Sequence, residues 1–140
     1  MRAIREDLAV LREAYEDFHP RVRGVLDACP KVHKWALVER EPMPQWSKGC
    51  VTLLGDACHP MTPYMAQGAA TAIEDGAIIS RCLKDTGASD VPRALERYEE
   101  TRKDRTARIQ LISRLNDMEK IKAETYQVYS YDAWNAPLAD

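Results

Sequence analysis

The first part of the chain carries apolar residues at helical spacing. From Ile4 to Phe18 an apolar residue recurs every three or four positions, with Arg, Glu and Asp on the opposite face, which predicts an amphipathic helix. His19-Pro20 interrupts this pattern, because a proline disfavours helical geometry at the residue before it. A second short helix is expected to follow and to end near Cys29-Pro30, so this part of the chain is predicted to form a helical hairpin.

Two short segments then carry β-forming residues. Lys34 to Arg40 is followed by Glu-Pro-Met-Pro, a sequence that cannot continue a hydrogen-bonded ladder. Cys50 to Leu54 is a short apolar run next to glycines, so we expect a strand that is buried on both faces. This second strand is predicted to end at Gly55-Asp56.

Two helices are expected in the rest of the chain. Small and aliphatic residues cover most of the circumference from Tyr64 or Met65 to about Lys84, which indicates a helix packed on several sides. Asp85 to Asp90 is predicted to be a turn, in which Gly87 suits a helix C-cap. A long, largely polar helix should then run to about Tyr129, and Asn135-Ala136-Pro137 is predicted to be a frayed tail.

Composition and charge restrict the class of protein. The 140 residues include 20 Lys plus Arg and 22 Asp plus Glu, with 45% hydrophobic residues, which is typical of a folded chain and excludes a disordered tail. The formal net charge of −2 supplies no basic field for nucleic acid. The sequence shows neither an apolar run of membrane-spanning length nor a signal peptide. We therefore expect a cytoplasmic protein without nucleic-acid or membrane partners.

The cysteines and histidines do not follow a metal-binding pattern. The four cysteines lie far apart and no C-x-x-C spacing occurs, which favours reduced thiols. Only Asp56, Cys58 and His59 cluster in the sequence, so no metal site is predicted. A thiolate–imidazole pair of Cys58 and His59 is not expected either, because neighbours on an extended chain point apart.

The segment from Leu53 to Asp75 combines features of a ligand site. A buried strand is predicted to end beside Asp56, a proline-stiffened loop follows, and Gly68 begins a helix, which is a location that ligands favour in α/β proteins. An ionised Asp56 can accept hydrogen bonds from ligand hydroxyls, and the unpaired N–H groups at the helix start favour negative charge on the ligand. Gly68, Ala69 and Ala70 leave room for a flat ring against the backbone.

Each feature of this segment also has an ordinary structural explanation. An Asp after a strand is often a turn former, and Gly-Ala-Ala at a helix start is often a matter of tight packing. Their succession within one short segment favours a binding site. His59 could act as an acid or base near a ligand, but we expect it to cap the loop, because nothing in the sequence identifies a proton that it must move.

The same segment resembles a known motif. Gly55-Asp56-Ala57-x-His59-Pro60, followed by Pro63, Gln67-Gly68-Ala69 and Ile73-Glu74-Asp75, is similar to the second flavin-binding motif of the FAD-dependent aromatic hydroxylases, the group A flavoprotein monooxygenases. The resemblance is to members of the salicylate hydroxylase and 6-hydroxynicotinate 3-monooxygenase kind. With the flanking segments it extends over roughly Leu8 to Ser113.

The resemblance implies a cofactor role for five positions. Gly55 and Asp56 would bind FAD, with the Asp56 carboxylate hydrogen-bonded to the ribityl hydroxyls. The backbone N–H groups of Gly68, Ala69 and Ala70 would face N1 and O2 of the isoalloxazine ring, where reduced flavin carries negative charge.

The resemblance also implies the chemistry of the parent protein. Pro63 corresponds to the loop position whose carbonyl lies close to the flavin and to a small aromatic substrate, with Tyr64 and Met65 near the ring. In this family NAD(P)H reduces FAD, oxygen adds to give a flavin hydroperoxide, and the distal oxygen attacks an electron-rich ring carbon. The enzyme class expected is therefore an FAD-dependent NAD(P)H aromatic monooxygenase of aromatic catabolism.

The predicted fold class follows from the same family resemblance. We expect an α+β, mostly helical chain that forms the C-terminal part of a Rossmann-like, glutathione-reductase-type FAD-binding α/β fold with a long terminal helix. Residues 1–49 would come from the substrate-domain side, 50–88 from the FAD-binding domain, and 89–140 would be the long helix and tail.

One expected motif is missing from the sequence. The G-x-G-x-x-G turn that holds the FAD pyrophosphate in this family does not occur, so the chain is interpreted as a C-terminal portion, incomplete for catalysis by itself. Its two predicted strands would then lack neighbours. The expected macromolecular partner is the N-terminal region of the same protein or a further copy of the chain.

Two alternatives stay open. A non-catalytic helical module would use the hairpin and the long terminal helix to pair with a partner chain, and its Gly-Asp segment would be only a turn. Stabilisation by added FAD would distinguish the flavin interpretation from this one. A related flavoenzyme that acts on a non-aromatic substrate is the other alternative, because the same motif serves epoxidation and oxidation.

Overall fold

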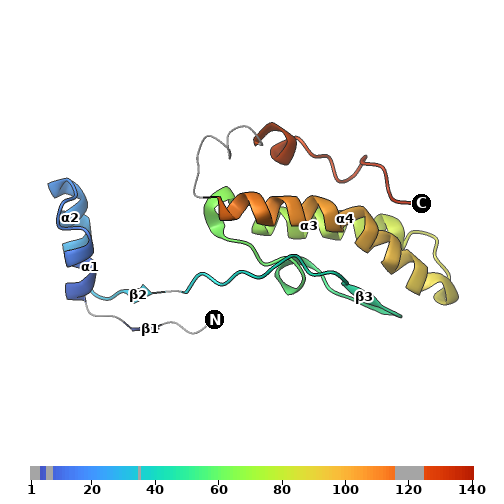
Figure 1. Cartoon of the computed structure of the whole chain (residues 1–140), viewed down its shortest axis with the longest axis horizontal. Helices are drawn as coiled ribbons and strands as arrows, with labels where there is room; N and C mark the ends of the chain where they lie inside the picture. Colours follow the sequence, from blue (N-terminus) through green and yellow to red (C-terminus); the bar gives the residue numbers. More distant parts are fainter. Residues whose placement is uncertain (1–3, 6–7, 35, 116–124) are drawn as a thin grey trace. The chain divides into compact units, whose positions relative to one another are not determined.

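The computed structural model describes residues 4–5, 8–34, 36–115 and 125–140 of the chain. The chain divides into two compact units, Met1–Leu37 and Val38–Asp140. Figure 1 colours the chain along its sequence.

The first unit holds two short helices and a two-stranded ladder. Its elements in chain order are β1 (Ile4–Arg5), α1 (Leu8–Ala14), α2 (Pro20–Asp27) and β2 (His33–Lys34). The two strands pair in antiparallel fashion. His19 caps α2, because its Nδ1 accepts the backbone N–H of Arg21 at 3.2 Å. An exposed ion pair of 2.8 Å between Arg12 and Asp27 joins the two helices.

The elements of the first unit are shorter than the sequence predicts. Ile4 and Arg5 belong to β1 rather than to the helix, because they pair with β2. The helix ends at Ala14 instead of Phe18, because the following residues form turns, such as the 3.1 Å bond from Phe18 N to the carbonyl of Tyr15. The strand expected from Lys34 to Arg40 is also wrong, since β2 ends at Lys34 and residues 36–40 form no regular structure.

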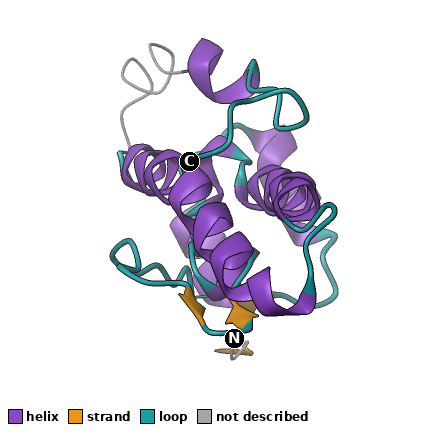
Figure 2. Cartoon of the chain, turned by 90° about the vertical axis from the view of Figure 1, so that its right-hand side faces the viewer, coloured by secondary structure: helices purple, strands orange, loops and turns teal. Residues whose placement is uncertain are grey.

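The second unit is built around two helices. Its elements are β3 (Ser47–Lys48), β4 (Val51–Thr52), the 3₁₀ turns Gly55–Ala57 and Pro63–Met65, α3 (Gly68–Cys82), a third 3₁₀ turn Ala88–Asp90, and α4 (Val91–Arg114). Figures 1 and 2 both show α3 and α4 side by side. β3 and β4 form an antiparallel ladder that α4 holds through Glu99, whose Oε2 accepts the N–H groups of Trp46 at 2.9 Å and Ser47 at 2.7 Å.

Apolar side chains fill two clusters between these elements. The first cluster consists of Trp46, Cys58, Ile78, Cys82 and Tyr98. The second consists of Met65, Ile109, Ile112 and Val128, and so joins the loop before α3, the end of α4 and the segment after it. Burial of these side chains supplies the main driving force for packing α3 on α4.

The strand and helices of the second unit differ from the prediction in three places. The strand expected over 50–54 is reduced to β4, and Val51 is 68% exposed, because only β3 pairs with β4 in the described part of the chain. The helix expected from Tyr64 begins at Gly68, since Ala66 adopts a left-handed conformation (φ +52°). It is not packed on several sides by the described residues, because Ile73 is 74% exposed.

The end of the chain also differs from the prediction. α4 ends at Arg114, where Leu115 becomes extended, and a separate helical turn covers 125–129, so no continuous helix reaches Tyr129. Gly87 does not cap α3 but precedes the third 3₁₀ turn. The tail is anchored rather than frayed. Arg81 donates to the carbonyls of Ala133 and Ala136, both at 2.8 Å.

The secondary structure is mostly helical, with little sheet. Within the residues that the structure describes, the sheets are two ladders of two strands each. None of the described helices combines the length and the apolar character that crossing a bilayer requires.

Candidate functional site

The turn after β4 lies directly against α3. Gly55 adopts φ +61°, a left-handed conformation that a glycine reaches without steric cost. A Cβ at this position would lie 3.2 Å from the Cβ of Ala72. The backbone conformation therefore favours a glycine here, and a side chain would also make a tight contact with α3.

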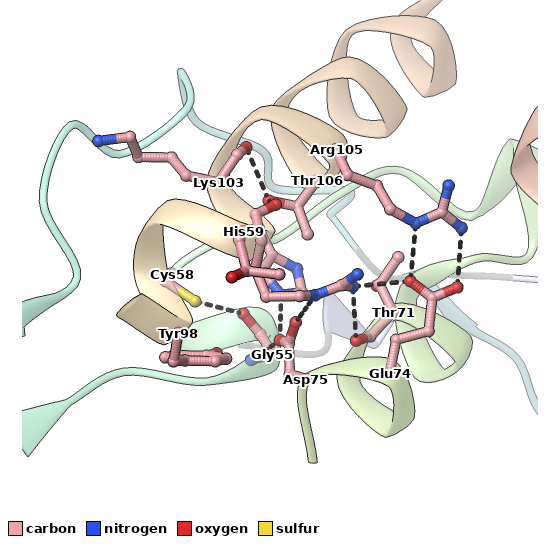
Figure 3. Close-up of polar contacts among 12 residues, drawn as sticks. Gly55, Cys58, His59, Thr71, Glu74, Asp75, Tyr98, Lys103, Arg105 and Thr106 are labelled. Atoms are coloured by element: carbon pink, nitrogen blue, oxygen red, sulfur yellow. Dashed lines mark hydrogen bonds and ion pairs between the residues drawn. The ribbon is translucent and has the colours of Figure 1, made fainter. Parts of the chain in front are cut away.

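A buried acid on α3 holds this turn. Oδ2 of Asp75 accepts the backbone N–H of Gly55 at 3.1 Å, and the same oxygen lies 2.6 Å from Nε2 of His59. Oδ1 of Asp75 accepts Nε of Arg102 at 2.7 Å. The side chains of His59, Asp75 and Arg102 are fully buried. Figure 3 shows His59 and Asp75 converging beside Gly55.

The buried cluster balances its charge. Arg102 also donates to Glu74 at 2.7 Å, and Arg105 binds both carboxylate oxygens of Glu74 at 2.8 and 2.9 Å. Two carboxylates thus face two guanidinium groups, which is the arrangement that buried charges require. Burial by itself raises the pKa of Asp75, but the hydrogen bonds from His59 and Arg102 outweigh it and hold that pKa below its usual range.

The ionised state of Asp75 determines the form of His59. A carboxylate only accepts hydrogen bonds, so Nε2 of His59 carries the hydrogen of the 2.6 Å bond. His59 does not line the cavity described below. Its geometry therefore favours the structural role over the acid–base role.

Cys58 and His59 lie closer together than the sequence suggests. The ligand atoms of Cys58, His59 and Asp75 all lie within 4.8 Å of one another, because the chain turns here instead of extending, and Asp75 rather than Asp56 joins the group. Burial raises the pKa of the Cys58 thiol to about 12, so the thiol stays protonated and donates to the carbonyl of Gly55. Because the thiol is protonated and Asp75 is already bonded to Arg102, the group is a poor cation site.

A cavity of about 610 Å³ lies beside the turn. It is lined by Leu54, Gly55, Asp56, Met61, Thr62, Pro63, Ala66, Gly68, Ala69 and Ala72. Five of the six predicted site residues are therefore brought together, and Ala70 does not reach the lining. The sequence analysis did not single out the apolar wall of Leu54 and Met61, because these residues carry no polar chemistry.

Asp56 presents a free carboxylate to this cavity. The residue is exposed, and within the described part of the chain its side chain makes no hydrogen bond or ion pair. Its Oδ1 lies 3.9 Å from the point where a Cβ on Gly68 would be. The absence of a side chain on Gly68 therefore keeps space open between the carboxylate and the start of α3.

The start of α3 offers backbone donors at the same place. The N–H groups of Gly68, Ala69 and Ala70 precede the first backbone hydrogen bond of the helix, which runs from Thr71 N to the carbonyl of Gln67 at 2.8 Å. Gln67 provides no side-chain cap. These donors and the positive end of the helix dipole favour a ligand group that carries negative charge.

The loop before α3 is held by α4 and by the tail. Pro63 lines the cavity, and its carbonyl accepts the N–H of Ala66 at 2.9 Å. Tyr64 is 55% exposed and lies outside the lining, whereas Met65 is buried in the second apolar cluster. Tyr129, in the helical turn 125–129 with which the tail begins, donates its hydroxyl to the carbonyl of Met65 at 2.6 Å. Sequence reasoning missed this contact, because it joins residues 64 positions apart.

Comparison with known proteins identifies the family. A family model described as an FAD binding domain matches residues 22–112. The chain belongs to this FAD-binding family. The resemblance inferred from the Gly55 to Asp75 motif is thereby confirmed.

Similar proteins are named as monooxygenases or hydroxylases of aromatic compounds. 6-Hydroxynicotinate 3-monooxygenase of Pseudomonas fluorescens is 47% identical over 130 residues, which cover 93% of this chain and 34% of that protein. 3-Hydroxybenzoate 6-hydroxylase of Polaromonas naphthalenivorans is 47% identical over 100 residues, which cover 71% of this chain and 25% of that protein. The chain spans about a third or less of the length of these relatives.

A solved structure shows the same fold. A salicylate hydroxylase substrate complex superposes with a TM-score of 0.76 at 25% sequence identity, and the match covers 94% of this chain and 36% of that chain. A crystal structure of CtdE in complex with FAD superposes with a TM-score of 0.75 at 27% identity, covering 93% of this chain and 34% of that chain. The fold is therefore that of FAD-dependent hydroxylases.

Proposed function

We propose that this chain is the flavin-contacting, C-terminal part of an FAD-dependent monooxygenase that hydroxylates an activated aromatic ring with NAD(P)H and O2. The observation that carries the proposal is the unpaired carboxylate of Asp56 at a 610 Å³ cavity beside the glycine–alanine start of α3. Membership of the FAD-binding family and the names of the similar proteins support it.

The residues around the cavity fit FAD. The free carboxylate of Asp56 suits the ribityl hydroxyls, since an ionised acceptor makes strong hydrogen bonds to hydroxyl donors. The N–H groups of Gly68, Ala69 and Ala70 suit the electron-rich N1–O2 edge of the isoalloxazine ring. Gly55, where a Cβ would make a tight contact with Ala72, brings the turn close to α3 and so to both contacts.

Bound FAD would supply the redox chemistry that accepts electrons from NAD(P)H and activates O2. This chain's own task is binding, orientation and the exclusion of water. Asp56 and the helix start hold the cofactor, while Leu54, Met61 and Pro63 present an apolar wall that keeps water from the site. Pro63, in the loop before α3, is the residue of this set that we place nearest a small aromatic substrate.

The remainder of the protein is proposed to come from outside this chain. The segment 50–88 would be the C-terminal part of a Rossmann-like FAD-binding domain, with 1–49 on the substrate-domain side and 89–140 as terminal helix and tail. The exposure of Val51 on β4 and of Ile73 on α3 supports a contact with further protein, since both are apolar side chains that such protein would cover. The proposed partner is the N-terminal region of the same protein, which would carry the binding site for the FAD pyrophosphate.

A chimera tests the proposal. The aligned 130-residue segment of the Pseudomonas fluorescens enzyme is replaced by the corresponding part of this chain. FAD binding to the apoprotein is measured by quenching of flavin fluorescence. In the chimera, Asp56→Asn should weaken FAD binding by about 10- to 100-fold, which is the usual effect of losing a hydrogen bond to a charged group. Asp104→Asn, which removes an exposed acid from α4 outside the cavity, should leave it unchanged. Equal FAD affinity in the two variants would contradict the proposal.

A further inference from the structure

The Asp75 carboxylate on α3 accepts the backbone N–H of Gly55 in the turn after β4, although Asp75 does not line the cavity. We infer that Asp75, held by Arg102 and His59, is a positioning residue of the flavin site that fixes Gly55 and thereby aims the Asp56 carboxylate into the cavity. The inference rests on the proposed function and deepens it. None of the three side chains lines the cavity, so each acts through the turn and not on the ligand.

The backbone of Gly55 is anchored at both of its polar groups. Its N–H donates to Oδ2 of Asp75 at 3.1 Å, and its carbonyl accepts the N–H groups of His59 at 2.9 Å and Cys58 at 3.0 Å. The side chain of His59 returns to the same Oδ2 atom at 2.6 Å. The turn and the carboxylate therefore form a closed loop of hydrogen bonds, in which Gly55 cannot rotate without breaking the bond to Asp75.

α4 fixes the carboxylate itself. Arg102 donates to Oδ1 of Asp75 at 2.7 Å, to Glu74 at 2.7 Å and to the carbonyl of Thr71 at 3.3 Å. The guanidinium thus spans one face of α3 and is fully buried. Moving the Asp75 side chain away from Arg102 would leave a buried carboxylate without its cation, which is strongly disfavoured, so this ion pair holds Asp75 in place.

Asp56 depends on this anchor because it has none of its own. Its side chain makes no bond within the described residues, so its direction is set by the backbone that precedes it. That backbone is a glycine in the left-handed region, a residue with the widest conformational freedom of any. Without the bond to Asp75, the direction of the Asp56 carboxylate would no longer be defined by Gly55.

Glu74 provides a matched control. It is the neighbour of Asp75 on α3, it is an acid, and it also binds Arg102 at 2.7 Å. It differs in making no hydrogen bond to the turn; its other partner is Arg105. Replacing either acid by alanine removes one charge from the same cluster and gives α3 the same new side chain. Only the substitution at Asp75 removes the anchor of Gly55.

The first experiment measures the anchor directly in this chain, without FAD. Amide hydrogen exchange of Gly55 is followed by NMR in Asp75→Ala and Glu74→Ala, with the mid-helix amide of Thr106 as reference. We expect the amide hydrogen of Gly55 to exchange about tenfold faster in Asp75→Ala than in Glu74→Ala, which is the effect of losing one ordinary hydrogen bond. If Asp75→Ala does not fold, the double variant Asp75→Ala/Arg102→Met removes both buried charges together and is compared instead. Equal exchange of Gly55 in the Asp75 and Glu74 variants overturns the inference.

The second experiment links the anchor to the cofactor. In the chimera, FAD dissociation constants are measured for Asp75→Ala, Asp56→Asn and the double variant. If Asp75 acts by aiming Asp56, its substitution should weaken FAD binding about tenfold in the parent chimera and by less than about twofold once Asp56→Asn is present. A purely structural role gives the same loss in both backgrounds, which overturns the inference. Failure of the parent chimera to bind FAD would contradict the proposed function instead, and the exchange of Gly55 would still decide whether Asp75 fixes the turn.

Discussion

Gly55 and Ala72 approach so closely that a Cβ on Gly55 would lie 3.2 Å from the Cβ of Ala72. One residue belongs to the turn after β4 and the other to α3, and the cavity lies between these two elements. The contact therefore sets the spacing between the turn and the helix start that together form the candidate flavin site.

This contact leads to a prediction about glycine substitutions. Gly55→Ala should lower the free energy of unfolding by about 1–2 kcal/mol for the left-handed backbone and by a further amount for the contact with Ala72. Gly49→Ala is the control, because Gly49 has a similar φ of +59° but no atom within 4 Å of its added Cβ. Urea unfolding of both variants measures the difference. Equal losses would show that the contact with Ala72 adds nothing.

A second prediction concerns acid. The pKa of Asp75 lies below its usual range in the folded chain, so its ionisation stabilises the fold fully above the unfolded-state value of about 4 and stabilises it progressively less as the pH falls below that value. The free energy of unfolding, measured in urea between about pH 3 and pH 7, should therefore fall below about pH 4. Asp75→Asn, which cannot ionise, should be less stable at pH 7 and show a weaker fall. An unchanged acid slope in this variant would contradict the assignment.

A third prediction concerns the thiols. Cys50 is exposed, whereas Cys58 and Cys82 are buried and burial raises the pKa of both. Because the thiolate is the reactive form, a disulfide reagent at neutral pH should label Cys50 first and leave Cys58 and Cys82 unmodified until the chain unfolds. Mass spectrometry of labelled peptides identifies the sites, and Cys50→Ser should remove the labelling of this residue and leave that of the half-buried Cys29. Early labelling of Cys58 would mean that the turn opens in the native state.

A fourth prediction concerns the tail. Tyr129 donates its hydroxyl to the carbonyl of Met65, in the loop that also carries Pro63. Tyr129→Phe should cost about 1 kcal/mol of stability and raise the exchange of amides in this loop. Tyr126→Phe is the control, because Tyr126 lies in the same helical turn, is 81% exposed and makes no side-chain bond among the described residues. Identical melting temperatures for the two variants would exclude a role of the tail in holding the loop.

Local chemistry in the sequence was enough to single out residues that line one cavity. Asp56, Pro63 and Gly68 line the same cavity, as the turn, proline and glycine signals suggest, although α3 begins at Gly68 and not at Tyr64. These features depend on residues that are close in sequence, and their conformational preferences are local and do not depend on distant parts of the chain.

The features that the sequence could not predict depend on distant residues. Arg102 binds Asp75, which lies 27 positions away in the sequence. The pattern of polar and apolar residues in α4 does not indicate which of its arginines is buried. Arg81 holds the tail through backbone carbonyls, which every residue carries, so the composition of the tail gave no sign of its anchoring. Val51 has the apolar character of an interior strand, but its exposure is decided by which strands pair with it.

The pairing of Asp75 with Arg102 has a consequence for how such chains diverge. Loss of Arg102 leaves the buried Asp75 carboxylate without its guanidinium, and loss of Asp75 leaves Arg102 with Glu74 alone, whereas a joint exchange to two apolar residues removes both buried charges. Related sequences should therefore keep both residues or replace both, and sequences that carry only one of the two should be rare.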